Sequence, residues 1–124
     1  MKLSVIPEYI RKLILRKVKL AVFVGDVPSL AEEGIAVKML EGNPNSMYFG
    51  EIPNMYEPMY QILIRARDYT VGATSAQAIK DVLDGYTDKN LQALTLVGSI
   101  LYLGRSEQKM HEFQLTFTAI IKEE

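Results

Sequence analysis

Alternation of apolar and polar side chains in two separate segments is the feature that most constrains the fold of this chain. Residues 60–67 and 112–121 each repeat with a period of two. Successive side chains of a strand point to opposite faces, so this pattern indicates two β-strands, each with one buried face. The chain is therefore expected to fold around a sheet. The apolar positions are Ile62, Ile64 and Ala66 in the first segment, and Phe113, Leu115, Phe117, Ala119 and Ile121 in the second.

Two other segments carry apolar residues at helical spacing, and we expect helices over residues 6–18 and 72–84. Thr74 and Gln77 are spaced as a capping box at the start of the second helix, and Gly85 fits its C-terminal stop. Each helix would therefore dock by one face. The apolar stripes are Ile6, Tyr9, Ile10, Leu13 and Ile14 in the first helix, and Ile79, Val82 and Leu83 with Ala76 or Ala78 in the second.

The remaining strands are shorter or less distinct. Residues 35–39 alternate and predict a short strand. Residues 90–100 fit a helix or a strand by periodicity, and their Thr, Val, Gly and Ser content favours a strand. Residues 20–24 are apolar and could add a further short strand, whereas residues 103–107 are expected to form a loop. The predicted class is α+β, in the order α-β-β-α-β-β, with a four-stranded, mostly antiparallel sheet and both helices packed on one face.

Residues 41–57 form the least regular segment, with two Gly and two Pro and few periodic positions. Connections this long in a compact domain tend to be functional or mobile. Large apolar side chains are unfavourable in water, so the segment either folds back over its own sheet or packs on a neighbouring subunit. We favour the neighbouring subunit because Met and aromatic residues are enriched at interfaces. These residues are Met47, Tyr48, Phe49, Met55 and Tyr56.

Composition indicates one globular domain over residues 1–124. Hydrophobic residues make up 48% and charged residues 23%, close to the average of globular domains. The sequence has no apolar run of the roughly 18 residues that cross a bilayer, and its start lacks the pattern of a signal peptide, so neither a membrane span nor secretion is expected. The absence of Cys excludes disulfides and thiolate metal ligands and fits synthesis in a reducing cytoplasm.

Charge is distributed unevenly along the chain. Residues 1–20 contain six Lys and Arg and one Glu, whereas the whole chain has a net charge of −1. Arg11, Lys12 and Arg16 fall outside the apolar stripe of the first helix and could contact phosphates or an acidic partner; the alternative is the solvated face of a helix. The basic helix lacks aromatic partners for base stacking, and no helix-turn-helix, RNA-recognition or zinc-finger pattern is present. Specific nucleic-acid recognition is therefore not expected.

The sequence carries no signature of an enzyme. His111 is the single histidine, and one histidine without Cys cannot form a transition-metal site unless several carboxylates surround it. A Ser-His-Asp arrangement would need His111, but no Gly-x-Ser-x-Gly elbow is present. Gly-rich phosphate-binding loops are also missing. We therefore predict no catalytic residues, no metal and no cofactor.

Arg65 and Arg67 stand between apolar residues in the first alternating segment, with Asp68 next along the chain. Two interpretations are open. The arginines could form an ion pair at the end of the strand, where an exposed pair contributes at most about 1 kcal/mol. They could instead pair with a carboxylate of a neighbouring subunit, for which the planar guanidinium is well suited.

Two short motifs give the chain a resemblance to a known family. The first is a Pro-x-x-Gln-x-x-x-Arg strand that leads into a helix, and the second is a Leu-Gly loop before the last strand. Together they resemble the tail terminator proteins, often labelled minor capsid proteins, of long-tailed bacteriophages, over most of the chain. The residues that match are Pro58, Gln61 and Arg65 in the strand, and Leu103, Gly104 and Glu107 in the loop.

The resemblance implies a structural virion protein at the head–tail junction. Family members assemble as a hexameric ring that caps the tail tube and joins it to the head connector. The implied partners are therefore further copies of the chain, the tail tube protein and the connector. The matching residues, with Arg67 and the apolar residues of the 41–57 segment, are the predicted interface. The sequence departs from the family pattern in residues 98–103, which lack the expected prolines, and at Ser106, where an acidic residue is expected. The alternative function is a small nucleic-acid-associated or regulatory domain that uses the basic helix.

Overall fold

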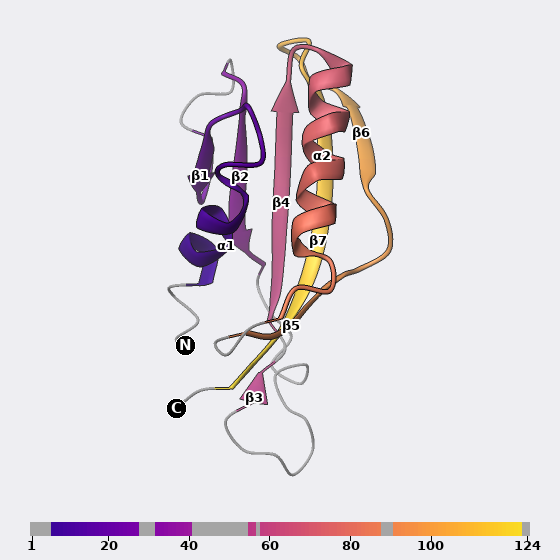
Figure 1. The fold of residues 1–124 in the computed structure, drawn as a ribbon. Coiled ribbons are helices and arrows are strands. Elements are labelled where there is room, and N and C mark those ends of the chain that lie inside the picture. The colour runs from indigo at the N-terminus through magenta and orange to yellow at the C-terminus, as the bar shows by residue number, and fades with distance from the viewer. Residues whose placement is uncertain (1–5, 28–31, 41–54, 57, 88–90, 123–124) are drawn as a thin grey trace.

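The computed structural model describes residues 6–27, 32–40, 55–56, 58–87 and 91–122. Two helices and seven strands follow one another in this part of the chain. Figure 1 shows both helices in front of the sheet, with β1 and β6 at its opposite sides. The elements are α1 (Ile6–Ile14), β1 (Val22–Val24), β2 (Gly34–Met39), β3 (Met55–Tyr56), β4 (Met59–Ala66), α2 (Tyr69–Leu83), β5 (Leu91–Leu96), β6 (Leu101–Arg105) and β7 (His111–Lys122).

The sheet is built around β7, the long last strand. β3 and β4 lie on one side of β7 in a single continuous register, and β5 and β6 lie on its other side, one after the other. β2 pairs with β4, and β1 pairs with β2, so the seven strands occupy five positions across the sheet. All pairs are antiparallel except β1 with β2. Within the described residues, β1 and the row of β5 and β6 are the two edges.

The predicted α+β class is confirmed, but the predicted element order and the four-stranded sheet are wrong. The predicted strands correspond to β2, β4, β5 and β7, and the further short strand is β1. The sequence pattern misses β3 and β6. β3 has two residues inside the segment expected to be irregular, and β6 includes Leu103 and Gly104, which are expected in a loop. Two residues are too few to establish a period, which explains the omission of β3. β6 is missed because its residues do not alternate and Gly104 is typical of a loop.

The core lies between the sheet and the two helices. One rung of the sheet, meaning the residues in register across successive strands, joins Ile35, Ile64 and Phe113, each at most 3% exposed. Burial of each such side chain contributes about 1.5–3 kcal/mol. A slip of one residue would turn this whole face to solvent, so the apolar face fixes the register. The helices add Ile6, Ile10, Ile14, Ile79 and Leu83 to the same core.

α2 begins at Tyr69, three residues earlier than predicted. The side chain of Asp68 is the N-cap. Its Oδ1 accepts hydrogen bonds from the backbone N–H groups of Thr70, at 2.7 Å, and Val71, at 3.3 Å. The predicted capping box is therefore wrong, because both of its residues lie inside the helix. A carboxylate shortly after a strand satisfies the first helical N–H groups and allows the helix to follow with only a short connection.

The other helix ends agree with the sequence in part. Gly85 follows α2 with a φ of 83°, a left-handed conformation that glycine adopts at little cost, which confirms the predicted C-terminal stop. α1 ends at Ile14, before the predicted end at residue 18. Within its apolar stripe the three isoleucines are buried, and Tyr9 and Leu13 are partly buried against the same core.

β5 and β6 form one interrupted outer strand along β7. The N–H of Val97 donates to the carbonyl oxygen of Thr116 at 2.7 Å, and Gly98, with a φ of 75°, lies in the interruption before β6 begins. A second irregularity lies inside β6, where the register against β7 shifts next to Gly104. The predicted strand over residues 90–100 is thus confirmed as β5. The expected loop over residues 103–107 is wrong for residues 103–105, which belong to β6, whereas residues 106 and 107 lie in the turn that follows.

Candidate interaction surfaces

The Pro-x-x-Gln-x-x-x-Arg motif lies on β4 and the residue that precedes it. Pro58 is buried, and its carbonyl oxygen accepts a hydrogen bond from the N–H of Ala119 at 3.0 Å. Gln61 is half-buried on the sheet face opposite the helices, in register with Lys38 and Thr116. Pro58 therefore stabilises the subunit itself, whereas part of the Gln61 side chain is accessible to a partner.

Arg65 is paired within the chain. It is 8% exposed, and its register neighbour on β7 is Glu112. Its Nε and Nη2 atoms each donate to Oε2 of Glu112 at 3.4 Å. Of the two interpretations left open by the sequence, the structure shows an ion pair, with Glu112 rather than Asp68 as the partner. The carboxylate offsets much of the cost of burying the guanidinium group.

Arg67 lies beyond the last residue of β4. Its backbone N–H donates to Oε1 of Glu33 at 2.7 Å, and its side chain is exposed. Because β4 ends at Ala66, the predicted strand over residues 60–67 is wrong at Arg67. Arg67 instead belongs to the short connection that ends in the Asp68 cap.

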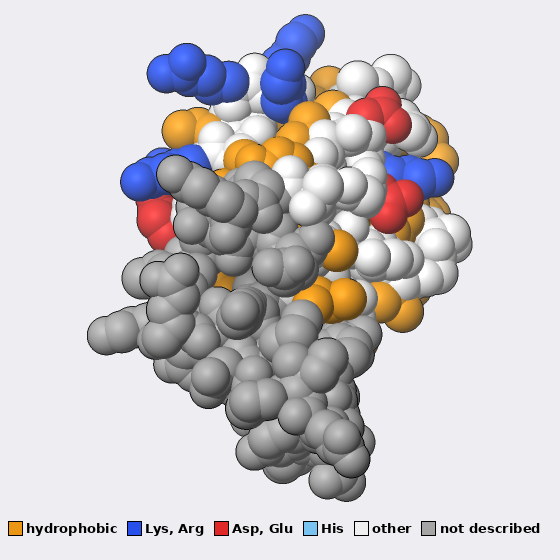
Figure 2. Space-filling model, turned by 60° about the horizontal axis from the view of Figure 1, so that its bottom comes forward, with side chains coloured by type: hydrophobic (Ala, Val, Ile, Leu, Met, Phe, Trp, Pro, Cys, Tyr) orange, Lys and Arg blue, Asp and Glu red, His pale blue; other side chains and the backbone are white. Residues whose placement is uncertain are grey.

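The basic face of α1 is less uniform than the sequence predicts. Arg11 donates from Nε to the carbonyl oxygen of Val22 at 2.9 Å and pairs through Nη1 with Glu8 at 3.0 Å. Arg11 therefore ties α1 to β1. Lys12 and Arg16 are exposed, and Figure 2 shows Lys and Arg side chains projecting from the surface. Contact with phosphates or an acidic partner stays a prediction for Lys12 and Arg16.

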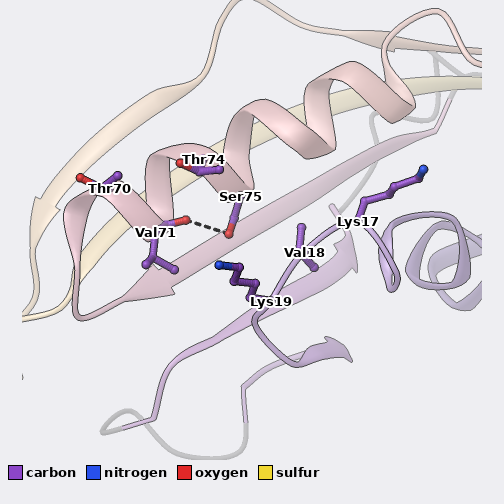
Figure 3. Close-up of a pocket in the computed structure, with 7 residues that line it drawn as sticks. All are labelled: Lys17, Val18, Lys19, Thr70, Val71, Thr74 and Ser75. Atoms are coloured by element: carbon purple, nitrogen blue, oxygen red, sulfur yellow. Dashed lines mark hydrogen bonds between the residues drawn. The ribbon is translucent and has the colours of Figure 1, made fainter.

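A pocket of about 230 Å³ lies between the segment that follows α1 and the first turns of α2 (Figure 3). The ammonium group of Lys19 points toward α2, whereas that of Lys17 points away. Ser75 is 5% exposed and donates its hydroxyl proton to the carbonyl oxygen of Val71 at 2.8 Å. Sequence patterns do not reveal this pocket because it joins segments that are far apart in the chain. Its lining residues are Lys17, Val18, Lys19, Thr70, Val71, Thr74 and Ser75.

β6 presents a surface that the sequence predicts only in part. Leu103 is 50% exposed, Gly104 is half-buried, and Glu107, in the turn after β6, is exposed. The strand also exposes Leu101 at 50% and Tyr102 at 45%, which the sequence analysis did not single out. Apolar exposure on this scale along one strand distinguishes β6 from the other strands in the described part of the chain.

An aromatic group lies next to β6. It consists of Tyr69, Tyr102, His111 and Phe113, with ring centroids of contacting pairs 5.1 to 5.9 Å apart. The hydroxyl of Tyr102 lies 2.7 Å from Nδ1 of His111 and shares a hydrogen bond with it. Tyr69 is 51% exposed, so the group extends the apolar surface of β6 onto the start of α2. Its two exposed tyrosines offer amphipathic rings of the kind enriched at interfaces.

Reactive groups are few in the described residues. No cluster of three or more His, Asp or Glu side chains is placed there to hold a metal ion. The hydroxyl of Tyr60 is buried and has no hydrogen-bond partner within that part of the chain, and burial raises its pKa well above the ordinary value. Tyr60 is 0% exposed, so its hydroxyl belongs to the core and not to a surface site. Over the same residues, no helix has the length and apolar character needed to span a membrane.

The apolar residues of the irregular segment are described only in part. Met47, Tyr48 and Phe49 lie outside the described residues, and their predicted partner contact stays a prediction. Met55 and Tyr56 form β3, whose backbone pairs with the end of β7. The expectation that this whole segment is irregular is therefore wrong at these two positions.

Comparison with protein families decides between the two predicted functions. A model of the bacteriophage tail terminator proteins matches residues 9–123. The chain belongs to this family. The match begins within α1 and extends beyond the end of β7, so it includes the strand motif, α2 and the β6 surface of the terminator.

One solved structure shows the same fold. A chain in the structure titled "Virion of native gene transfer agent (GTA) particle" superposes on the terminator with a TM-score of 0.57 and 16% sequence identity, covering 90% of this chain and 85% of that chain. At this level of identity the likeness shows a shared fold alone. No curated protein gives a significant match.

Family membership confirms the resemblance drawn from the two short motifs. The terminator is a structural protein of the phage virion, and its predicted place at the head–tail junction is confirmed with it. The residues that carry the resemblance have different positions: Pro58 and Arg65 are buried, whereas Leu103 and Glu107 are exposed.

Proposed function

We propose that the terminator assembles as a closed hexameric ring that caps the tail tube, stops the addition of tube protein and presents its other side to the head connector. Residues 1–124 act as one domain in each subunit. Family membership supports the role in the tail. The arrangement of the sheet supports association between copies.

The observation that carries this proposal is the pair of open sheet edges. Within the described residues, β1 pairs only with β2, and β6 pairs only with β7. An unpaired edge exposes backbone N–H and C=O groups that readily bind another strand, so proteins cover, twist or charge such edges. Both edges also carry exposed apolar side chains: Val24 is 47% exposed and Leu101 50%. They are protected only in part, because Arg11 binds the carbonyl oxygen of Val22 in β1 and the register of β6 shifts next to Gly104. Edges of this kind favour association with further protein.

The predicted interface residues differ in what they can contribute. Leu103 and Glu107 are exposed, and Gln61 is half-buried, so each can contact a second protein. Pro58 and Arg65 are buried and have partners within the chain. We propose that these two residues stabilise β4 and the strands beside it, and that the exposed residues make the contact with the second protein.

The test uses the tube protein encoded by the same phage. Tube protein is polymerised with and without an excess of terminator, and tube lengths are measured by negative-stain electron microscopy. The terminator, carrying a gold label, should stop the elongation of the tubes, and the label should appear at one end of each tube. An unrelated protein of similar mass is the control. Unchanged tube lengths, or label distributed along the tube wall, would contradict the proposal.

A further inference from the structure

We propose that neighbouring copies of the terminator meet edge to edge, with the outer edge of β1 in one copy forming an antiparallel pair with the outer edge of β6 in the next. The proposal rests on the ring proposed above and adds the surfaces that form it. We define the β1 edge as Val22–Val24 and the β6 edge as Leu101–Arg105.

The two edges lie at the same level of the sheet. A single rung begins at Phe23 on β1 and passes through the registers of β2, β4 and β7 to Leu101 on β6. The adjacent rung joins Val22 to Tyr102 in the same way. Copies placed side by side with no shift along the strands therefore bring β1 of one opposite β6 of the other. A closed ring needs this condition, because a shift at each step would give an open helix.

The directions of the two strands also fit. β1 is parallel to β2, and each of the three pairings from β2 through β4 and β7 to β6 is antiparallel. β6 therefore runs opposite to β1 within one copy. Copies in the same orientation would pair these edges as an antiparallel ladder, the arrangement already used through most of the sheet. The contact is heterologous, so each copy uses two different edges and the assembly can close by rotation.

Exposed apolar side chains stand at both edges. Leu101, Tyr102 and Leu103 are each 45–50% exposed at the β6 edge. Val24 is 47% exposed at the β1 edge, and Met39, on the adjoining strand, is also 47% exposed. The registers place Val24 and Tyr102 on the same face of the sheet as the helices, because Val24 is level with buried Val37 and Tyr102 with buried Phe113. Joining the edges with no shift would set Tyr102 opposite Val22, with Val24 diagonal to Tyr102 on the same face, and Leu101 opposite Phe23 on the other face.

The first test is cross-linking, which the absence of Cys makes specific. Val24→Cys and Tyr102→Cys are prepared as separate variants, mixed, and treated with a short bismaleimide. We expect a covalent dimer in the mixture and little product from either variant alone. The double variant should give a ladder of covalent multimers. Efficient dimers of the Tyr102→Cys variant alone would mean that two β6 edges meet, and would overturn the proposal.

The second test measures self-association by sedimentation. Leu101→Asp places a charge in the proposed contact, and Gln108→Asp places the same charge at an exposed position in the turn after β6. We expect Leu101→Asp to raise the concentration at half-assembly by about tenfold or more, and Gln108→Asp to leave it unchanged. Both variants should keep the thermal unfolding of the unchanged protein, since both positions are exposed.

The outcomes separate this inference from the proposed function. If the unchanged protein assembles and caps tubes, but the cross-link does not form and Leu101→Asp assembles normally, the edge contact is wrong and the ring stands. If the unchanged protein neither assembles nor caps tubes, the proposed function fails first. Cross-linking between Val24 and Tyr102 positions together with capping supports both.

Discussion

The substitution Gly72→Ala tests how tightly α2 packs on the sheet. Gly72 lies in the first part of α2, directly over β7. A Cβ atom at this position would stand 2.6 Å from Cε2 and 3.0 Å from Cδ2 of Phe113, and 3.3 Å from the Cβ of Ala66. The shortest of these distances is below any normal contact, so the ring or the helix must move.

Two opposing effects determine how much Gly72→Ala changes the free energy of unfolding. Replacing a helical glycine by alanine gains up to about 1 kcal/mol of helix propensity. Overpacking a core typically costs about 1–3 kcal/mol. Phe113 is 3% exposed, and its ring is backed by Tyr69 at 5.4 Å and Tyr102 at 5.1 Å, so it has little room to retreat. We therefore place the packing cost in the upper part of its range and expect a net loss of about 1–2 kcal/mol in the free energy of unfolding.

The assay is urea denaturation followed by circular dichroism, with the wild-type slope as a check that unfolding stays two-state. The decisive control is the same substitution in a Phe113→Leu background, where the ring is absent. There Gly72→Ala should raise stability by up to about 1 kcal/mol, so the sign of its effect reverses. A Gly72→Ala variant as stable as the unchanged protein, or the same loss in both backgrounds, would refute the close contact.

Three further substitutions test other parts of the structure by urea denaturation. Asp68→Ala should lower the free energy of unfolding by about 1 kcal/mol through loss of the α2 cap, whereas Thr74→Ala, inside the helix, should change it by less than about 0.5 kcal/mol; equal losses would restore the capping box predicted from the sequence. Glu112→Gln should cost about 1–3 kcal/mol because it removes the negative charge that Glu112 places beside Arg65, which is 8% exposed; an unchanged midpoint would show that the pair contributes nothing. Tyr60→Phe should leave stability unchanged or raise it by about 1 kcal/mol, because it removes a buried hydroxyl with no partner in the described part of the chain; a loss above about 1 kcal/mol would mean that this hydroxyl is hydrogen-bonded.

The parts of the fold with a sustained period follow from the sequence. The alternation in β4 and β7 predicts both strands and the apolar face that they share, because a half-buried strand requires such a pattern. The helical stripe of α1 and the stop at Gly85 also follow from local chemistry. In these segments, local preference and tertiary packing favour the same structure.

The parts of the fold that depend on residues far apart in the chain cannot be predicted from the sequence. β6 becomes a strand because β7 pairs with it, although Gly104 and the turn residues after it are typical of a loop. Arg65 is paired by register with Glu112, which is 47 residues away along the chain. The N-cap of α2 is missed for a different reason. Asp68 lies two residues after the end of β4, and the spacing of Thr74 and Gln77 offers a second, plausible start inside the helix.

The candidate interaction surfaces can likewise be predicted from the sequence only in part. The two motifs resemble the family, yet two of their six residues, Pro58 and Arg65, are buried and have partners inside the subunit. The exposure of Leu101 and Tyr102 cannot be predicted from the local sequence. It depends on the order of the strands, which places β6 at an edge of the sheet. The sequence therefore indicates what the protein is more readily than where it contacts its neighbours.

Native mass spectrometry of the purified chain shows directly whether the ring closes. We expect one dominant closed species at six times the 14.0 kDa subunit mass, with few intermediate forms, because both edges of each copy are paired only when the ring closes. The Leu101→Asp variant should shift the distribution to the single chain. A monomer at every concentration, or a symmetric dimer that does not grow further, would contradict the closed ring.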